Sequence, residues 1–284
     1  MRRFYEIAGI RFCVTAPEGE GFEGDGILTN FRTDPSAEYH EVSLRLVEQA
    51  EPPEGELYAA DGSVCAFRNG EKLIYYRGCY ERQWEKGYLR IARDRNCTHA
   101  QLRKYSDAVR LCVGTALDAM ELPHRLVQND GFLLHASYID VRGEAVLFTA
   151  PSGTGKSTQA SLWCKLRNAR LINGDRAAVR VGRESAYACG VPYSGSSPVR
   201  ENVTLPLKAV VVLSQAKETS IDRLDAMAAF RKIWKGCSVN TWDAEDMNLC
   251  ARTVMRMLSC VPVYHLACTP DESAVCALEE KLGK

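Results

Sequence analysis

One short stretch limits what this chain can fold into. Residues 148–163 read FTAPSGTGKSTQASLW, and residues 150–157 match the spacing of a phosphate-binding loop with Ala150 in the first glycine position. The apolar run AVLFT leads into the loop, and residues 156–173 follow without glycine or proline. A strand, a glycine loop and a helix in this order direct unpaired backbone N–H groups toward an anion. The stretch therefore predicts a nucleotide-binding loop in an α/β domain.

Each position of this loop has a physical role in binding a nucleoside triphosphate. Gly153 and Gly155 allow positive φ and a close approach to phosphate oxygens. Lys156 supplies a positive charge for the β and γ phosphates, and Ser157 offers a hydroxyl to Mg²⁺. The alternative is an ordinary glycine and serine turn before a helix. We expect the nucleotide to be held by Ser152, Gly153, Thr154, Gly155, Lys156, Ser157 and Thr158.

Three common classes of nucleotide-binding protein lack support in the sequence. A GTPase would carry an N-K-x-D motif, and none follows the loop. A motor or transporter ATPase would carry an apolar strand ending in aspartate, whereas AVVVLSQ ends in Ser214 and Gln215. An adenylate-kinase-like enzyme would show an arginine-rich lid segment soon after the loop, and none is apparent. These absences leave the less common classes.

Two residues outside the loop are candidates for chemistry. Asp175 follows a strand pattern, ARLING, 19 residues after Lys156, where it would hold Mg²⁺ directly or through water. The alternative is a turn aspartate after Gly174. His135 ends an apolar stretch 21 residues before Lys156, in a strand expected beside the loop strand. Its alternative is a structural histidine in the core.

Composition excludes several partners. The 284 residues are 46% hydrophobic and carry 36 basic and 36 acidic side chains, so the balance is not that of a nucleic-acid binder. The longest apolar runs, such as AVVVL at 209–213, are too short to cross a membrane. The 12 cysteines form no C-x-x-C pair, and no secretory leader is apparent. We expect a cytoplasmic protein that binds neither nucleic acid nor membrane.

The chain is expected to have two parts. Residues 1–100 alternate apolar and polar positions between turn-rich stretches, which predicts a β-rich N-terminal region. Residues 101–284 form the domain with the loop, beginning with a linking helix at about 101–122 that Pro123 ends or kinks. Further helices are expected at 225–236, 243–259 and 271–282, the last capped by Thr269 or Asp271.

Several motifs, taken in order, resemble a known family. The segments FLLHAS, VLFTAPSGTGKSTQASLW, LINGDRAAVR and GVPYSGSSPVRENVTLPLKAVVVLSQA are similar to those of kinases related to HPr kinase/phosphorylase. That family is also similar to the P-loop part of ATP-dependent phosphoenolpyruvate carboxykinases. The resemblance covers about residues 105–284. It implies an α/β fold (α+β overall): a P-loop kinase domain of this type preceded by the smaller β-rich region.

The resemblance also implies an activity. The family transfers a phosphoryl group from ATP to a serine-type hydroxyl, on free serine, a peptide or a small carrier protein. Carried over by motif, it implies Lys156, Asp175 and His135 as catalytic residues, and Ser157 and Asp175 as ligands of Mg²⁺. Related kinases form oligomers, which implies a homo-oligomer here. The family's usual Asp-Asp pair reads Gly174-Asp175 in this chain, so its general base is in question and His135 is a substitute.

Other interpretations stay open beside the kinase. Arg200, in the hydroxyl-rich loop CGVPYSGSSPVREN, faces a phosphate or an acidic substrate group, or else lies in solvent beside a structural turn. The chain as a whole is alternatively a nucleotide-binding protein without transfer activity, whose β-rich half recognises a partner. A phosphoenolpyruvate carboxykinase-like enzyme fits poorly, because such enzymes are much longer and need a second set of metal ligands.

Overall fold

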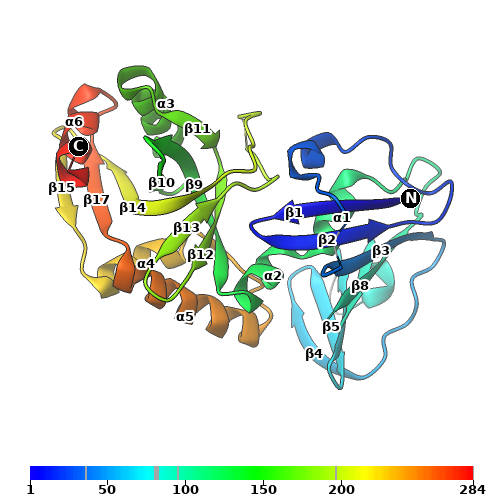
Figure 1. Cartoon of the computed structure of the whole chain (residues 1–284). Helices are drawn as coiled ribbons and strands as arrows, with labels where there is room; N and C mark the ends of the chain where they lie inside the picture. The colour runs from blue at the N-terminus through cyan, green and yellow to red at the C-terminus, as the bar shows by residue number, and fades with distance from the viewer. Residues whose placement is uncertain (36, 80–82, 95, 196, 284) are drawn as a thin grey trace. The chain divides into compact units, whose positions relative to one another are not determined.

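The chain divides into two units, each built around its own sheet (Figure 1). The computed structural model describes residues 1–35, 37–79, 83–94, 96–195 and 197–283. The first unit comprises Met1–Arg125 with Thr241–Ala244, and the second comprises Leu126–Asn240 with Glu245–Lys284. The architecture is therefore mixed α/β with two sheets. By this division the predicted linking segment, 101–122, groups with the first unit.

The first unit is an eight-stranded sheet in the order β1-β2-β3-β8-β7-β6-β5-β4. Its strands are β1 (Arg2–Ile7), β2 (Ile10–Thr15), β3 (His40–Val47), β4 (Glu56–Asp61), β5 (Val64–Asn69), β6 (Lys72–Arg77), β7 (Leu89–Arg93) and β8 (Cys97–Arg103). Two short 3₁₀ helices, η1 (Gly26–Phe31) and η2 (Trp84–Lys86), lie between strands. The expectation of a β-rich N-terminal region is confirmed. Residues 80–82 of this region lie outside the described ranges.

The predicted helix at 101–122 is wrong at its start. Residues up to Arg103 belong to β8, and the helices are α1 (Val113–Met120) and α2 (Leu122–Gln128). The segment 97–103 has no glycine or proline, and its strand character depends on pairing with β3 and β7, which local spacing does not show. Glu121 separates the two helices in the left-handed region, with φ 48°. Pro123 lies in the first turn of α2, where its missing N–H needs no partner.

Glu121 is also the centre of a buried ionic group in the first unit. Its Oε1 accepts hydrogen bonds from the Tyr75 hydroxyl at 2.7 Å and from Arg93 Nη1 at 2.5 Å. Arg93 Nη2 donates to Asp243 Oδ2 at 2.9 Å. The Arg93 guanidinium and the other nearby cations hold the pKa of Glu121 below its usual value, although burial opposes this. Buried charges need such pairing, so this group ties the segment 241–244 to the first unit.

The second unit contains a sheet in the order β10-β9-β12-β13-β14-β17-β15, with β11 and β16 also paired to β9. Its strands are β9 (Gly131–Val141), β10 (Glu144–Thr149), β11 (Arg170–Asn173), β12 (Arg176–Val181), β13 (Ala186–Cys189), β14 (Thr204–Gln215), β15 (Ser220–Arg223), β16 (Cys237–Ser238) and β17 (Val263–Cys268). Its helices are α3 (Lys156–Arg167), α4 (Ala226–Trp234), α5 (Ala244–Cys260) and α6 (Glu272–Leu282). The helices expected from 225, 243 and 271 are confirmed, and Asp271 is the cap of the last.

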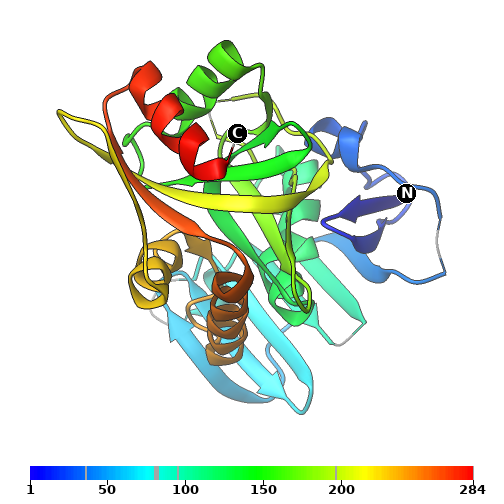
Figure 2. The same ribbon diagram turned by 60° about the vertical axis from the view of Figure 1, so that its left-hand side comes forward.

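Helices cover both faces of this sheet. Figure 2 shows α3 and α6 on one side and α4 and α5 on the other. The α3 side is closed by Ala160, Trp163 and apolar residues of α6, which pack on Phe148 and Val211. The α4 side is closed by Ile233 and by residues of α5. Because both faces are buried, the central strands are apolar almost throughout, as the run Ala209–Leu213 shows.

The parallel strands of the sheet fix where a site can form. β10 pairs in parallel with β14, with Thr149 opposite Val212, and β14 pairs in parallel with β17. The carboxyl ends of β10 and β14 therefore lie at one edge, and β14 runs on for three residues to Gln215. Ligands of open α/β sheets bind at such edges. The chain leaves β10 at this edge and enters α3.

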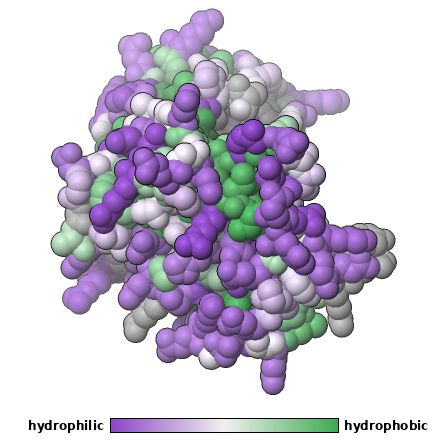
Figure 3. All heavy atoms as spheres, turned by 90° about the vertical axis from the view of Figure 1, so that its right-hand side faces the viewer, coloured by the Kyte–Doolittle hydropathy of each residue, from purple (hydrophilic) through white to green (hydrophobic). Residues whose placement is uncertain are grey.

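The face seen in Figure 3 is mostly polar, with one stripe of hydrophobic side chains and smaller hydrophobic groups apart from it. This agrees with a composition that is 25% charged residues. Among the described residues, no helix is both long enough and apolar enough to span a bilayer.

The buried His40 makes the first unit sensitive to acid. Its Nε2 lies 2.8 Å from Thr98 Oγ1, and burial, with the charge of Arg125, lowers its pKa from 6.5 to about 3. The unfolded chain therefore binds this proton near pH 6.5 and the folded chain only near pH 3, so stability is lost as pH falls between the two. We predict that this costs about 2 kcal/mol of unfolding free energy at pH 5.

Urea titrations at pH 7, 6 and 5 measure this loss. His40→Gln keeps a hydrogen-bonding side chain that does not titrate, so the variant should lose less stability over this range than the wild type. Parallel loss of stability in the two proteins would contradict the assignment to His40.

Candidate functional site

The glycine loop, residues 150–157, connects β10 to α3 at the edge described above. Gly153 has φ 78° and Gly155, the N-cap of α3, has φ 118°, both in the region that favours glycine. A methyl group at either position would meet nothing within 4 Å, so the space beside the loop is open. Substitution is disfavoured there by backbone conformation rather than by crowding.

The start of α3 presents backbone donors without partners. Among the described residues, none accepts a hydrogen bond from the N–H of Gly155, Lys156 or Ser157. Successive free N–H groups at the start of a helix attract an anion. The Lys156 ammonium lies on the same loop, where its Nζ donates to the carbonyls of Ala150 at 3.0 Å and Pro151 at 3.4 Å. Burial lowers the pKa of Lys156, and Asp175 partly opposes that shift.

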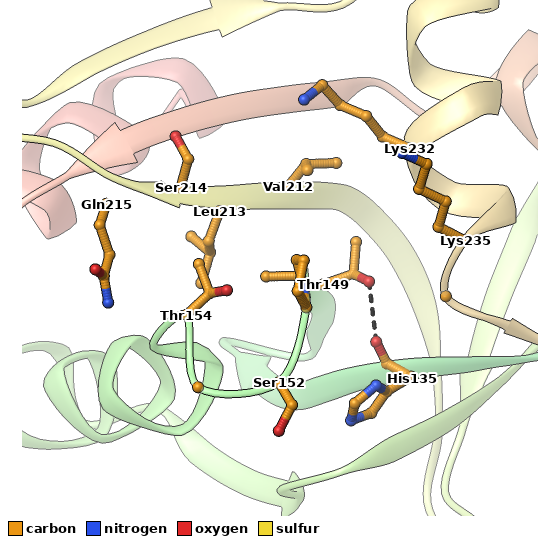
Figure 4. A pocket seen from close by; sticks show the side chains of 14 residues that line it. His135, Thr149, Ser152, Thr154, Val212, Leu213, Ser214, Gln215, Lys232 and Lys235 are labelled. Atoms are coloured by element: carbon orange, nitrogen blue, oxygen red, sulfur yellow. Dashed lines mark hydrogen bonds between the residues drawn. The ribbon is translucent and has the colours of Figure 1, made fainter.

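A cavity of about 730 Å³ opens beside the loop (Figure 4). It is lined by His135, the segment from Thr149 to Thr154, the end of β14 from Val212 to Gln215, and Lys232, Lys235 and Gly236. Of the predicted nucleotide-binding residues, Ser152, Gly153 and Thr154 line it, whereas Gly155, Lys156, Ser157 and Thr158 do not. The first three face the cavity from the loop, and the others belong to the start of α3.

His135 lines the cavity and contacts Asp175. His135 Nε2 lies 3.2 Å from Asp175 Oδ1, and Asp175 Oδ2 lies 3.4 Å from Arg176 Nε. Burial lowers the pKa of His135, the charge of Lys156 lowers it further, and Asp175 opposes both effects. The imidazole is therefore neutral near pH 7. The structure brings His135, Asp175 and Lys156 into one electrostatic group.

The main chain around His135 is fixed from two sides. Its N–H donates to the Gly236 carbonyl at 2.8 Å, and its carbonyl accepts from Thr149 Oγ1 at 2.9 Å. Figure 4 shows the second of these bonds, at the end of β10. β9 thus holds the histidine between the segment after α4 and the strand that leads into the glycine loop.

Asn173 positions Asp175, and sequence reasoning missed it. This residue is 0% exposed, and its Oδ1 accepts from the N–H groups of Asp175 at 2.9 Å and Arg176 at 3.0 Å. Its Nδ2 donates to the carbonyls of Val191 at 3.0 Å and Tyr193 at 2.8 Å. One amide therefore joins the turn before β12 to the following loop. The only sequence signal was an asparagine two residues before the candidate acid, which is a common turn arrangement.

There is no room for a side chain at Gly174. A Cβ at Gly174 would lie 2.8 Å from Ser197 Cβ, and one at Gly195 would lie 3.0 Å from Asp175 Oδ1. The loop 190–199 therefore packs closely against this turn. A larger residue at 174 requires the loop to move, because contacts under 3.0 Å are not tolerated. Residue 196 of this loop lies outside the described ranges.

Arg200 does not line the cavity. Its guanidinium donates to Ser194 Oγ, with Nε at 3.1 Å, and its backbone pairs with that of Asn173 in an isolated bridge. It therefore lies near the turn that carries Asp175, on the loop side. Its predicted role with a phosphate or an acidic group stays a prediction.

Two lysines of the cavity wall were not identified from sequence. Lys232 lies in the last turn of α4, and Lys235 is the residue that caps that helix. Both line the cavity, and Figure 4 shows them on the side opposite Ser152 and Thr154. A helix was expected over 225–236, but no local pattern shows which of its basic residues face a site formed by distant strands.

Fold and site define a class: a mixed α/β protein with a glycine loop, a helix N-terminus and a neutral histidine around one cavity. The family model described as SynChlorMet cassette protein ScmC matches residues 102–271, more than half of the chain. The chain therefore belongs to the ScmC family.

The solved Hpr(Ser) kinase/phosphatase from Coxiella burnetii is similar over 53% of this chain and 97% of that chain, with 9% identity and a TM-score of 0.32. That likeness is one of fold at most and carries no argument about activity. No curated protein matches the chain.

Removing the Asn173 amide should destabilise the second unit. Asn173→Ala leaves two N–H groups and two carbonyls without their buried partner, and we predict a loss of about 2 to 4 kcal/mol of unfolding free energy. Asn173→Asp keeps the two accepted bonds but places a carboxylate oxygen against two carbonyls, so it should also be destabilising. Urea denaturation gives both values, with the exposed Asn69→Ala as control. A loss below about 0.5 kcal/mol, as for an ordinary surface change, would contradict this role.

Proposed function

We propose that this protein catalyses ATP-dependent phosphoryl transfer to a serine-type hydroxyl. One observation carries the proposal: the unpaired N–H groups at the start of α3 lie beside a cavity that also exposes the neutral His135, itself paired with Asp175. Donors for a phosphate chain and an acceptor for a hydroxyl proton are thus close together in one unit. The resemblance of the motifs to kinases related to HPr kinase/phosphorylase supports the same reaction class.

The residues present fit ATP and Mg²⁺. A phosphate chain would be held by the loop from Ser152 to Thr158, whose free N–H groups and open space beside Gly153 and Gly155 suit an anion. The exposed Ser157 and the carboxylate of Asp175 are hard oxygen donors, the type that Mg²⁺ prefers while keeping several waters. When bound, the nucleotide supplies the phosphoryl group and the metal ion offsets its charge.

The chain's own residues would then position the reactants and take a proton. With Nε2–H donating to Asp175, the His135 ring presents an unprotonated Nδ1, which would accept the proton of the acceptor hydroxyl. Asp175 orients the ring and stabilises its charged form. Lys156 would leave the carbonyls of Ala150 and Pro151 to place its ammonium against the transferring charge.

In this proposal His135 serves as the base in place of a second acid at Gly174. The family resemblance implies two adjacent acids. This chain has only Asp175, because the other position is Gly174, which packs against Ser197. Because phosphoryl transfer depends more on positioning than on a strong base, a neutral histidine supported by a carboxylate is sufficient. The acceptor in this proposal is free serine, a peptide or a small carrier protein, and the protein acts in the cytoplasm as a homo-oligomer.

A second candidate has its own supporting observation. The Lys156 ammonium is bonded within the loop to Ala150 and Pro151, and the site has one carboxylate instead of two. A protein that binds nucleotide without transferring phosphate, and recognises a partner through its β-rich unit, would have the same features. Phosphate transfer from labelled ATP separates the two candidates.

Two substitutions test the catalytic assignment. We predict that Lys156→Ala lowers the rate of transfer by about a hundredfold or more, because it removes the positive charge that stabilises the negative charge of the transition state. Asp175→Asn should weaken the dependence of the rate on Mg²⁺. Transfer of label from ATP to free serine, to serine peptides and to proteins of a cell extract is the measurement. Arg142→Gln, an exposed change outside the cavity, is the control. If ATP binds but label reaches none of these acceptors, the second candidate replaces the kinase.

The pH dependence of transfer tests His135. Since its pKa lies below the ordinary 6.5, the base is active at neutral pH, and the rate should fall only as pH drops below 6.5 toward the lowered pKa. We expect His135→Gln to lower the rate about a hundredfold or more and to remove this acidic limb. An unchanged acidic limb in the variant would assign the titration to another group.

A further inference from the structure

Two ammonium groups of the cavity wall have no anionic partner. Among the described residues, neither Lys232 nor Lys235 forms an ion pair or a hydrogen bond, although the charge of Lys232 adds to burial in lowering the pKa of His265. They lie three positions apart at the end of α4, so they are neighbours on one helix face and repel each other. An anion bound in the cavity between the two ammonium groups would relieve that repulsion.

The charge of the cavity lining is one-sided. Its lining contains Lys232 and Lys235 and no aspartate or glutamate. The remaining lining is formed by backbone of the glycine loop, by neutral side chains and by His135, which is uncharged near pH 7. A hollow lined by charges of one sign focuses their field and raises the local concentration of the opposite ion.

The main chain that follows the two lysines is bonded to the strand that carries the histidine. The carbonyl of Gly236, the residue after Lys235, accepts the His135 N–H at 2.8 Å. Next along the chain, β16 pairs with β9, with Cys237 opposite Leu134. In Figure 4 the lysine side chains lie on the α4 side of the cavity, and Ser152 and Thr154 lie on the opposite side. A group held by these lysines would therefore lie in the same cavity as His135.

We propose that Lys232 and Lys235 form an anion subsite for the acceptor, and that the acceptor is an acidic peptide whose serine-type hydroxyl has carboxylates close to it. The assignment of the bound molecule as acceptor rests on the proposed function. The subsite itself rests on the cavity, its two unpaired ammonium groups and the absence of carboxylates among its described lining residues. Two ammonium groups suit two carboxylates held as charge-assisted hydrogen bonds.

A structural explanation of the lysines predicts something different. Basic residues in the last turn of a helix stabilise it through the helix macrodipole, and Arg231 and Lys232 both lie in that turn of α4. Arg231 shares this position but does not line the cavity. It is therefore a matched control: removal of its charge alters the helix terminus in the same way and leaves the cavity unchanged.

Binding of two labelled peptides tests the subsite without requiring catalysis. The probes are fluorescein-labelled hexapeptides with a central serine, one flanked by glutamates and the other by glutamines. They are titrated into the full chain saturated with ADP and Mg²⁺, at low salt. We expect the glutamate peptide to bind about tenfold more tightly, and the preference to shrink as salt is raised. Lys232→Gln with Lys235→Gln should abolish the preference, and Arg231→Gln should retain it.

Any other result of the peptide titrations overturns the proposal. A wild type without preference, including one that binds neither peptide, lacks the subsite. A preference that survives in the double variant places it elsewhere. If the double variant weakens ADP binding instead, measured by calorimetry, the lysines serve the nucleotide. Phosphate transfer is scored separately: a charge preference without transfer would refute the kinase and keep the subsite, whereas transfer without a charge preference would do the opposite.

Discussion

The parallel pairing of β10 with β14 is the constraint on which the site depends. With Thr149 opposite Val212, the chain leaves β10 at the edge where β14 continues to Gln215. The glycine loop therefore turns beside the end of a neighbouring strand, and α3 starts there with its free N–H groups. Apolar packing on both faces of the sheet, through Trp163 on one side and Ile233 on the other, holds this edge in place.

Around that edge, long strands bring distant segments together. β9 pairs with β10 along one half and with β12 along the other, so His135, near its middle, meets Asp175 in the turn just before β12. Asn173 then fixes the turn of Asp175 against the loop that contains Val191 and Tyr193. The result is a buried hydrogen-bonded frame with a neutral histidine on its open side.

The sequence predicted those elements whose conformation depends on neighbouring residues in the chain. The glycine loop, the helix after it and the later helices follow from spacing. Capping chemistry offered Thr269 or Asp271 for the last helix, and the structure has Asp271 there. The segment 97–103 was misread, because its pairing with β3 and β7 decides that it is a strand. Lys232, Lys235 and Asn173 were missed for the same reason: their roles come from what lies opposite them.

The sequence by itself determined that the chain contains a strand, a glycine loop and a helix suited to an anion, because backbone conformation and free N–H groups are local properties. It also determined a β-rich first region through alternation of apolar residues. Only the tertiary structure decided that His135 meets Asp175, that Ser197 lies against Gly174 and that two lysines line the same cavity as the loop. Those contacts join residues far apart in the chain, and the packing of strands and helices alone brings them within reach.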